Sequence, residues 1–233
     1  MRTRFVALLR RAFHGLPLGW QRSLQSRRQS WQDAKGRREF RRQLRSGVPL
    51  KIVVGTCGMS VPGWISSDVG YLNLLRPEHW AAQFAPASIE AILAEHVWEH
   101  LSPAEGLVAA RTCYDYLRPG GYLRVAVPDG FHPDPAYRRQ VQVGGSGFGA
   151  DDHKVLYDHL TFSALFTRAG FAVTLLEYFD DRGQFHTQPW DPAGGMVRRS
   201  QRFDPRNEAG HLHYTSLILD ARKPAATPAP PAV

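Results

Sequence analysis

Short apolar runs and amphipathic stretches alternate along the chain from residue 48 onward. Runs rich in β-branched residues predict strands, and apolar positions at helical spacing predict helices between them. The strands expected on this basis are residues 51–54, 64–69, 89–94, 122–127, 171–178 and 214–221. Strands that alternate with helices in this way predict an α/β domain.

Two of the intervening helices carry end signals. Ser102 can cap the first, because Pro103 suits the first helical position and Glu105 completes a capping box. We expect that helix to end at the Pro-Gly-Gly sequence of residues 119–121. The second helix, residues 161–169, is followed by a glycine in the position of a C-cap.

The two ends of the chain have different patterns. Apolar residues at positions 5, 8, 9, 12, 13 and 16, with arginines largely elsewhere around the turn, predict a basic amphipathic helix. Residues 21–45 are polar and Arg-rich, and predict a solvated helix with Trp31, Phe40 and Leu44 as its apolar anchors. Residues 224–233 are rich in Pro and Ala, which predicts a disordered tail.

The net charge of the N-terminal segment also differs from that of the rest of the chain. The 233 residues carry a net charge of +8, but residues 1–46 hold 13 basic and 2 acidic residues, a net of +11, and the remainder hold 16 and 19, a net of −3. We therefore expect a basic, partly helical arm (1–46), a folded domain (47–223) and the tail (224–233). The arm suits an anionic membrane surface, through residues 1–20, or nucleic-acid phosphates, and an organelle transit peptide stays open as well.

Several classes of protein are disfavoured. No apolar run approaches about 18 residues, so no transmembrane helix is expected. Arginines at positions 10 and 11 interrupt the N-terminal apolar stretch, which argues against a secretory signal. Two cysteines, Cys57 and Cys113, are too few for a disulfide framework and suit a reducing compartment. We expect a cytoplasmic protein, with peripheral membrane docking of the arm left open.

A glycine pair and a carboxylate have the spacing of a nucleotide-type site. Gly55 and Gly58 follow the first strand, and Asp68 ends the second. Glycines let backbone approach a ligand closely, and a carboxylate at the end of the next strand can accept hydrogen bonds from ribose hydroxyls. A glycine pair after a strand is equally typical of a tight turn.

Three sequence stretches, which follow one another along the chain, strengthen the interpretation of a nucleotide-type site. They are KIVVGTCGMSVPGWISSD, ILAEHVWEHLSPAEGLVAARTCYDYLRPGGYLRVAVPDG and HKVLYDHLTFSALFTRAGF. Together they resemble class I S-adenosylmethionine-dependent methyltransferases, and more narrowly predicted bacterial members with PGWI, EHVxEHL and LRPGGxLRxAVPD motifs. The resemblance covers roughly residues 50–176. It implies a Rossmann-like three-layer sandwich with a closing antiparallel hairpin, and S-adenosylmethionine as cofactor.

The resemblance also implies site residues. It assigns the methionine part of the cofactor to the first loop, the ribose to the carboxylate after the second strand, and the cofactor flank to the end of the third expected strand. The residues concerned are Gly55, Thr56, Cys57 and Gly58, then Asp68, then Glu95 and His96. Cys57 departs from the family, which usually has a glycine at or near that position, and a Cβ there could crowd the cofactor.

A zinc motif overlaps this segment. His96-x-x-Glu99-His100 matches the H-x-x-E-H pattern, in which two histidines on one helical face bind zinc. Zinc would need a third protein ligand downstream, and no helix of the sequence obviously offers one. We therefore predict no metal site, and expect His100 to cap or to bond to the backbone.

Catalysis by a methyltransferase of this kind would call for a base if the acceptor is a hydroxyl. His153 is the preferred candidate, His96 is the second, and Asp129 follows a strand beside the expected crevice. A solvated loop histidine at 153 and a turn residue at 129 are the structural alternatives.

The predicted function is methyl transfer to a small molecule or saccharide, with O-methylation favoured. Residues 130–153 are rich in Gly, Pro and Asp and too polar for the core. We expect residues 130–152 and 179–210 to shape the acceptor pocket. A methyltransferase-like module that has lost catalysis through its altered glycine loop is the alternative. A nucleic-acid methyltransferase is less favoured, because the folded part is mildly acidic and has no obvious aromatic-basic stripe.

Overall fold

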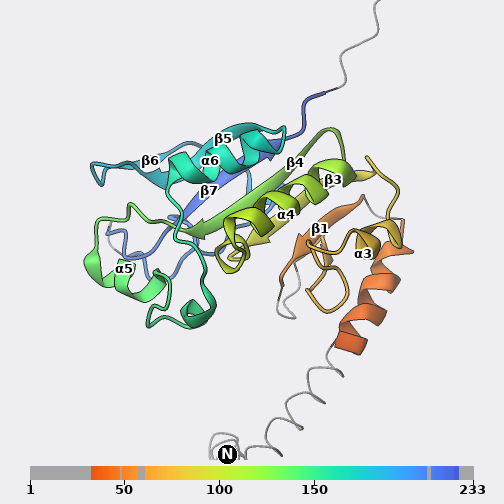
Figure 1. Ribbon diagram of the computed structural model, residues 1–233, viewed down its shortest axis with the longest axis horizontal. Helices are drawn as coiled ribbons and strands as arrows, with labels where there is room; N and C mark the ends of the chain where they lie inside the picture. Colours follow the sequence, from red (N-terminus) through yellow and green to blue (C-terminus); the bar gives the residue numbers. More distant parts are fainter. Residues whose placement is uncertain (1–32, 48, 57–60, 209–210, 226–233) are drawn as a thin grey trace, which may run out of the picture.

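The computed structural model describes residues 33–47, 49–56, 61–208 and 211–225. A seven-stranded sheet runs through the described part (Figure 1). Its strands are β1 (Lys51–Val54), β2 (Ile65–Ser66), β3 (Ile89–Glu95), β4 (Leu117–Pro128), β5 (Ala172–Phe179), β6 (Phe185–Thr187) and β7 (Ser216–Arg222).

The sheet is mixed, with the spatial order β2-β1-β3-β4-β7-β5-β6. Strands β2, β1, β3 and β4 are parallel. Strand β7 inserts antiparallel between β4 and β5, and β6 pairs antiparallel with β5 at the edge. The predicted Rossmann-like α/β fold with a closing antiparallel pair is confirmed.

In the described residues between the strands, there are four helices and three 3₁₀ turns. They are α3 (Pro77–Ala81), α4 (Pro103–Tyr116), α5 (Pro135–Val141), α6 (His159–Arg168), η1 (Trp98–His100), η2 (Ala150–Asp152) and η3 (Pro192–Gly194). Helix α4 begins with the predicted capping box of Ser102 and Glu105. Helices α4 and α6 cover the same face of the sheet, and α6 ends before Gly170, which has a φ of +100° (Figure 1).

Alternate residues of the central strands pack on opposite faces. Val54 and Ile92 belong to the large core under the helices, whereas Val53 and Leu93 face the other side. There they meet Val197 in the segment that follows η3. The three layers are therefore the helices, the sheet and a largely irregular cover.

The described end of the basic arm is part of this architecture. Residues 33–44 are helical and lie beside α3 at the β1–β2 end of the sheet (Figure 1). The side chain of Phe40 is 2% exposed, and its ring centroid lies 5.5 Å from that of Tyr71 and 6.2 Å from that of Phe84. Phe40 thus anchors a helix whose arginines face outward, as the pattern predicted.

The amphipathic helix expected near the N-terminus, Trp31 and the tail from residue 226 lie outside the described residues. Within the described ranges, no helix is long and apolar enough to cross a membrane.

Three expectations were wrong in detail. Strand β2 has two residues where six were predicted. Helix α4 ends at Tyr116, before the Pro-Gly-Gly sequence, because Leu117 is already extended and pairs with Ile89. Residues 130–153 are not wholly outside the core, since α5 buries Tyr137 and Val141.

Candidate cofactor and acceptor site

The loop after β1 is fixed by steric and hydrogen-bond constraints. Gly55 has a φ of +68°, and a Cβ built there would lie 2.6 Å from Cγ2 of Val97. The backbone N–H and hydroxyl of Thr56 both donate to the Ser67 carbonyl, at 3.1 and 3.2 Å. The ends of β1 and β2 are therefore joined directly. Cys57 and Gly58 lie outside the described residues.

Asp68 follows β2 at the same edge of the sheet. One carboxylate oxygen accepts a hydrogen bond from the Val69 N–H at 2.8 Å. Within the described part of the chain, the other oxygen makes no hydrogen bond, and the side chain is only partly buried. An acceptor of this kind beside a left-handed glycine turn fits the ribose of a nucleotide-type cofactor.

Glu95, at the end of β3, has other partners. Its carboxylate accepts hydrogen bonds from the backbone N–H groups of Arg198 and Arg199, at 3.1 and 2.9 Å. It also lies 3.5 Å from the Arg199 guanidinium. Glu95 therefore holds the irregular cover against the carboxyl end of β3. Its predicted place on the cofactor flank stays a prediction.

His96 has an uncommon backbone conformation. Its φ is +56°, a left-handed value that costs a residue with a side chain about 1–2 kcal/mol. Its Nε2 lies 3.0 Å from the Ser216 hydroxyl oxygen, and its Nδ1 lies 3.2 Å from a carboxylate oxygen of Glu99. The ring stacks on Tyr214, with 6.3 Å between centroids. Contacts on both edges hold the strained residue in place.

Serine, histidine and glutamate in this order have the connectivity of a hydrolase triad. Ser216, however, is 0% exposed and pairs with Pro128 in the β4–β7 ladder. A buried hydroxyl of this kind orients the His96 ring and has no access to a substrate. The sequence offered no signal for Ser216, because it contacts His96 only through the fold.

Glu99 is the buried acid of this group, with a side chain that is 1% exposed. Burial acts to raise its pKa, but the charge and close approach of His96, the backbone of Glu99 itself and the charge of His100 together outweigh burial and hold the pKa below its usual range. Two histidines thus stabilise a carboxylate inside the protein. The sequence marked Glu99 only as part of the zinc motif.

Asp129 is fully buried, and both its oxygens bind backbone. They accept hydrogen bonds from the N–H groups of Phe131, at 2.9 Å, and Phe179, at 2.7 Å. Burial raises its pKa to about 6, against the opposing effect of these hydrogen bonds. In this arrangement Asp129 joins the ends of β4 and β5, and its predicted catalytic role stays a prediction.

His153 lies against Glu99 and His100, and is 8% exposed. Its Nδ1 is 2.7 Å from the carbonyl oxygen of Val141, and its ring meets that of His100 edge-on with centroids 4.9 Å apart. His153 is therefore a buried histidine with defined partners, which differs from the solvated loop histidine considered as its alternative.

A hollow of about 430 Å³ lies between α5 and the chain that precedes β7. It is lined by Asp134, Tyr137, Gln140, Arg206, Glu208, His213 and Tyr214. The two segments predicted to shape the acceptor pocket thus meet in one concavity. Tyr214 links the hollow to His96 through the ring stack.

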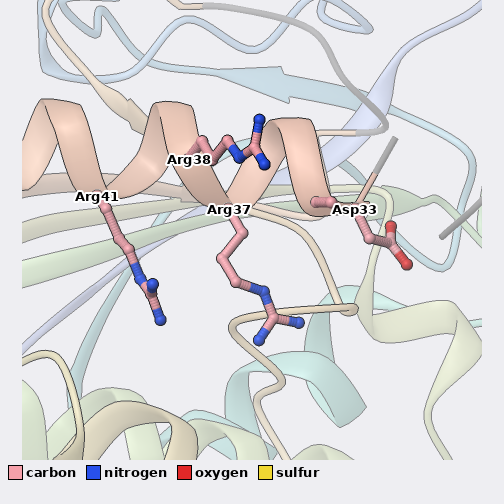
Figure 2. Close-up of a pocket in the computed structure, with 5 residues that line it drawn as sticks. Asp33, Arg37, Arg38 and Arg41 are labelled. Atoms are coloured by element: carbon pink, nitrogen blue, oxygen red, sulfur yellow. The ribbon is translucent and has the colours of Figure 1, made fainter. Parts of the chain in front are cut away.

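A second hollow, of about 400 Å³, lies on the helix of residues 33–44. Asp33, Arg37, Arg38 and Arg41 line it, and the side chains of Arg37 and Arg41 project from the same side of the helix (Figure 2). Arg37 also donates to the Gly70 carbonyl at 3.0 Å, which attaches the helix to the turn after Asp68.

Solved structures with a similar fold include several methyltransferases. A SAM-dependent methyltransferase from Archaeoglobus fulgidus is 13% identical, with a TM-score of 0.44 over 82% of this chain and 94% of that one. One from Mesorhizobium loti is 12% identical, with a TM-score of 0.45 over 78% and 94%. A possible exported protein from Bordetella parapertussis is 15% identical, with a TM-score of 0.41 over 82% and 68%.

No family model and no curated protein matches the chain. Identities and TM-scores this low concern the fold and carry no function from one chain to another.

Proposed function

We propose that the chain is an S-adenosylmethionine-dependent methyltransferase that O-methylates a hydroxylated small molecule or saccharide. One observation carries the proposal: the Gly55 turn and the Asp68 carboxylate follow the carboxyl ends of two adjacent parallel strands, β1 and β2. Open α/β sheets bind nucleotide-type ligands at this edge. The motif resemblance of residues 50–176 supports the same cofactor.

We assign the residues of the proposed site the following roles. When bound, S-adenosylmethionine supplies an activated methyl group. Asp68 would hold the ribose hydroxyls through its carboxylate, and the backbone at Gly55 and Thr56 would line the cofactor. The protein's contribution is to orient the acceptor and to exclude water.

The acceptor would occupy the hollow of about 430 Å³. Tyr137 and Tyr214 offer aromatic faces there, and Arg206 and Glu208 offer polar groups of both charges. Aromatic faces with a few convergent polar groups suit a hydroxylated ligand. His96 is the proposed base for the hydroxyl proton, because its ring stacks on Tyr214, one of the residues that line this hollow. Its Nε2 would exchange the Ser216 contact for the acceptor hydroxyl.

The experiment is an assay of S-adenosylhomocysteine release with a panel of hydroxylated acceptors, including free sugars and nucleotide sugars. We expect turnover with at least one hydroxyl acceptor, and a loss of about 100-fold in kcat for His96→Gln. His186→Gln, in a histidine paired with Asp180 outside the hollow, is the control. Turnover with amine acceptors alone would contradict O-methylation.

The alternative is a methyltransferase-like module that has lost catalysis, for which Cys57 in the glycine loop is the motivating residue. It predicts no turnover on any acceptor and no binding of S-adenosylhomocysteine at millimolar ligand. Docking of the arm on nucleic acid or on an anionic membrane is a separate proposal. The arginines beside Asp33 support docking only because they give this surface a positive charge. Co-sedimentation with anionic vesicles, with and without residues 1–20, would test binding of the arm to a membrane.

A further inference from the structure

Three side chains of metal-ligand type converge behind His96. Glu99 and His100 come from η1, and His153 follows η2. One potential ligand atom from each lies within 4.8 Å of the other two. A carboxylate with two imidazoles is a ligand set that proteins use for zinc and related divalent metals.

Backbone hydrogen bonds hold the two contributing segments together. The N–H groups of Lys154 and Val155 both donate to the Glu99 carbonyl oxygen, at 2.7 and 3.3 Å. His153 is therefore held next to Glu99 by the two residues that follow it.

The hydrogen bond of His153 to the backbone leaves one of its ring nitrogens available to a metal. A carbonyl oxygen only accepts, so Nδ1 of His153 must carry the proton that it donates to Val141 at 2.7 Å. The remaining nitrogen, Nε2, then has a lone pair. A histidine that ligates a metal commonly donates its other N–H to a backbone carbonyl or carboxylate in this way.

Glu99 supplies an independent indication. Its side chain is 1% exposed, and within the described residues neither carboxylate oxygen makes a hydrogen bond of good geometry. His96 approaches to 3.2 Å without the alignment of a hydrogen bond. Nδ1 of His100 is also buried without one, although the Asp152 carboxylate lies 3.4 Å away. Buried polar atoms left in this state call for a missing partner.

We propose that Glu99, His100 and His153 bind a divalent transition metal, with Zn²⁺ as the expected ion. Tetrahedral zinc with bonds of about 2.0–2.1 Å separates its ligand atoms by roughly 3.3 Å, so the cluster must contract on binding. The side chain of His100 is 32% exposed, and a water entering on that side would complete the coordination.

The proposed ligands differ from those of the zinc motif in the sequence. The pattern pairs His96 with His100 on one helical face, but His96 lies in a left-handed turn before a 3₁₀ segment of three residues. His153 takes the place of His96, and it is the downstream ligand that no helix obviously offered. The proposal replaces the expectation of no metal site and does not depend on the proposed methyltransferase activity.

The test is zinc binding by the full chain, freed of any affinity tag and of metal, titrated with Zn²⁺ against a chromogenic chelator. We expect one zinc per chain, and at least tenfold weaker binding in Glu99→Gln and in His153→Ala. His186→Ala should bind like the unsubstituted protein. Far-ultraviolet circular dichroism of the metal-free variants checks that they fold.

X-ray absorption of the zinc-loaded, unsubstituted protein needs no variant. We expect two imidazoles, further light N/O ligands and no sulfur in the coordination shell. Failure to retain one zinc per chain, a sulfur ligand, or unchanged affinity in folded His100→Ala/His153→Ala would overturn the proposal.

Discussion

Nδ1 of His96 lies 3.2 Å from a carboxylate oxygen of Glu99, and the two residues meet where β3 ends. Glu99 is buried, and the charges of His96 and His100 favour its ionised form, so removing its carboxylate leaves these two histidines without their counter-charge. We expect Glu99→Ala to lower the free energy of unfolding by about 2–3 kcal/mol in metal-free buffer. Asp151→Ala, an exposed acid in η2, is the control and should change stability by less than about 0.5 kcal/mol. Equal stabilities in urea unfolding would contradict the structural role of Glu99.

Gly55 and Gly63 form a matched pair of left-handed glycines, with φ values of +68° and +76°. A Cβ at Gly63 would meet nothing within 4 Å, whereas one at Gly55 would clash with Val97. Gly63→Ala should therefore cost only the backbone strain of about 1–2 kcal/mol, and Gly55→Ala should cost more. Adding Val97→Ala to Gly55→Ala removes the clash, so the double variant should lose less stability than the two single losses combined. Thermal and urea unfolding measure these differences, and equal losses in the two alanine variants would contradict the packing.

Asp129 makes stability depend on pH. Its pKa of about 6 in the folded chain exceeds the ordinary aspartate value of 3.8, so folding favours the protonated form. The stabilisation is fully present below about pH 4 and is lost as the pH rises through 6. Relative to Asp129→Asn, which cannot titrate, the unsubstituted protein should lose up to about 3 kcal/mol of stability between pH 4 and pH 7. A difference that stays constant with pH in urea unfolding would show that Asp129 has an ordinary pKa.

Arg124 joins the sheet to its irregular cover. Its guanidinium makes two hydrogen bonds to the Asp220 carboxylate, at 2.8 and 2.9 Å, and two to the carbonyls of Asp191 and Gly195. Because the pair is largely buried, Arg124→Ala should destabilise the protein by about 3–5 kcal/mol. Arg222→Ala, whose guanidinium is exposed on the neighbouring strand, should cost about 0–1 kcal/mol. Similar unfolding midpoints for the two variants would contradict this difference.

Local chemistry made much of the fold predictable. The capping box of Ser102 and Glu105 and the stop before Gly170 are signals carried by adjacent residues, and both are present. The short β2 and the early start of β4 were not predictable in the same way. Both depend on which strands pair, and pairing is decided by the sheet as a whole.

In the candidate site too, local sequence patterns identify some residues, whereas others depend on contacts between distant segments. Gly55, Thr56 and Asp68 each lie at a strand end, so their common edge follows from a parallel sheet. The contacts of Glu95 with the backbone at Arg198 and of His153 with Glu99 join distant segments, and no local pattern specifies them. Phe40 was identifiable as an anchor, but the Tyr71 and Phe84 rings that receive it were not.

Calorimetric titration of S-adenosylhomocysteine into the full chain tests the proposed cofactor site most directly. We expect one ligand per chain, and an affinity about 10–100-fold lower in Asp68→Ala, because a charge-assisted hydrogen bond to a ribose hydroxyl is worth roughly 1.5–3 kcal/mol. Asp181→Ala, an exposed acid in the turn after β5, should bind like the unsubstituted protein. Absence of binding at millimolar ligand, or equal affinities for the unsubstituted protein and Asp68→Ala, would contradict the proposed cofactor site.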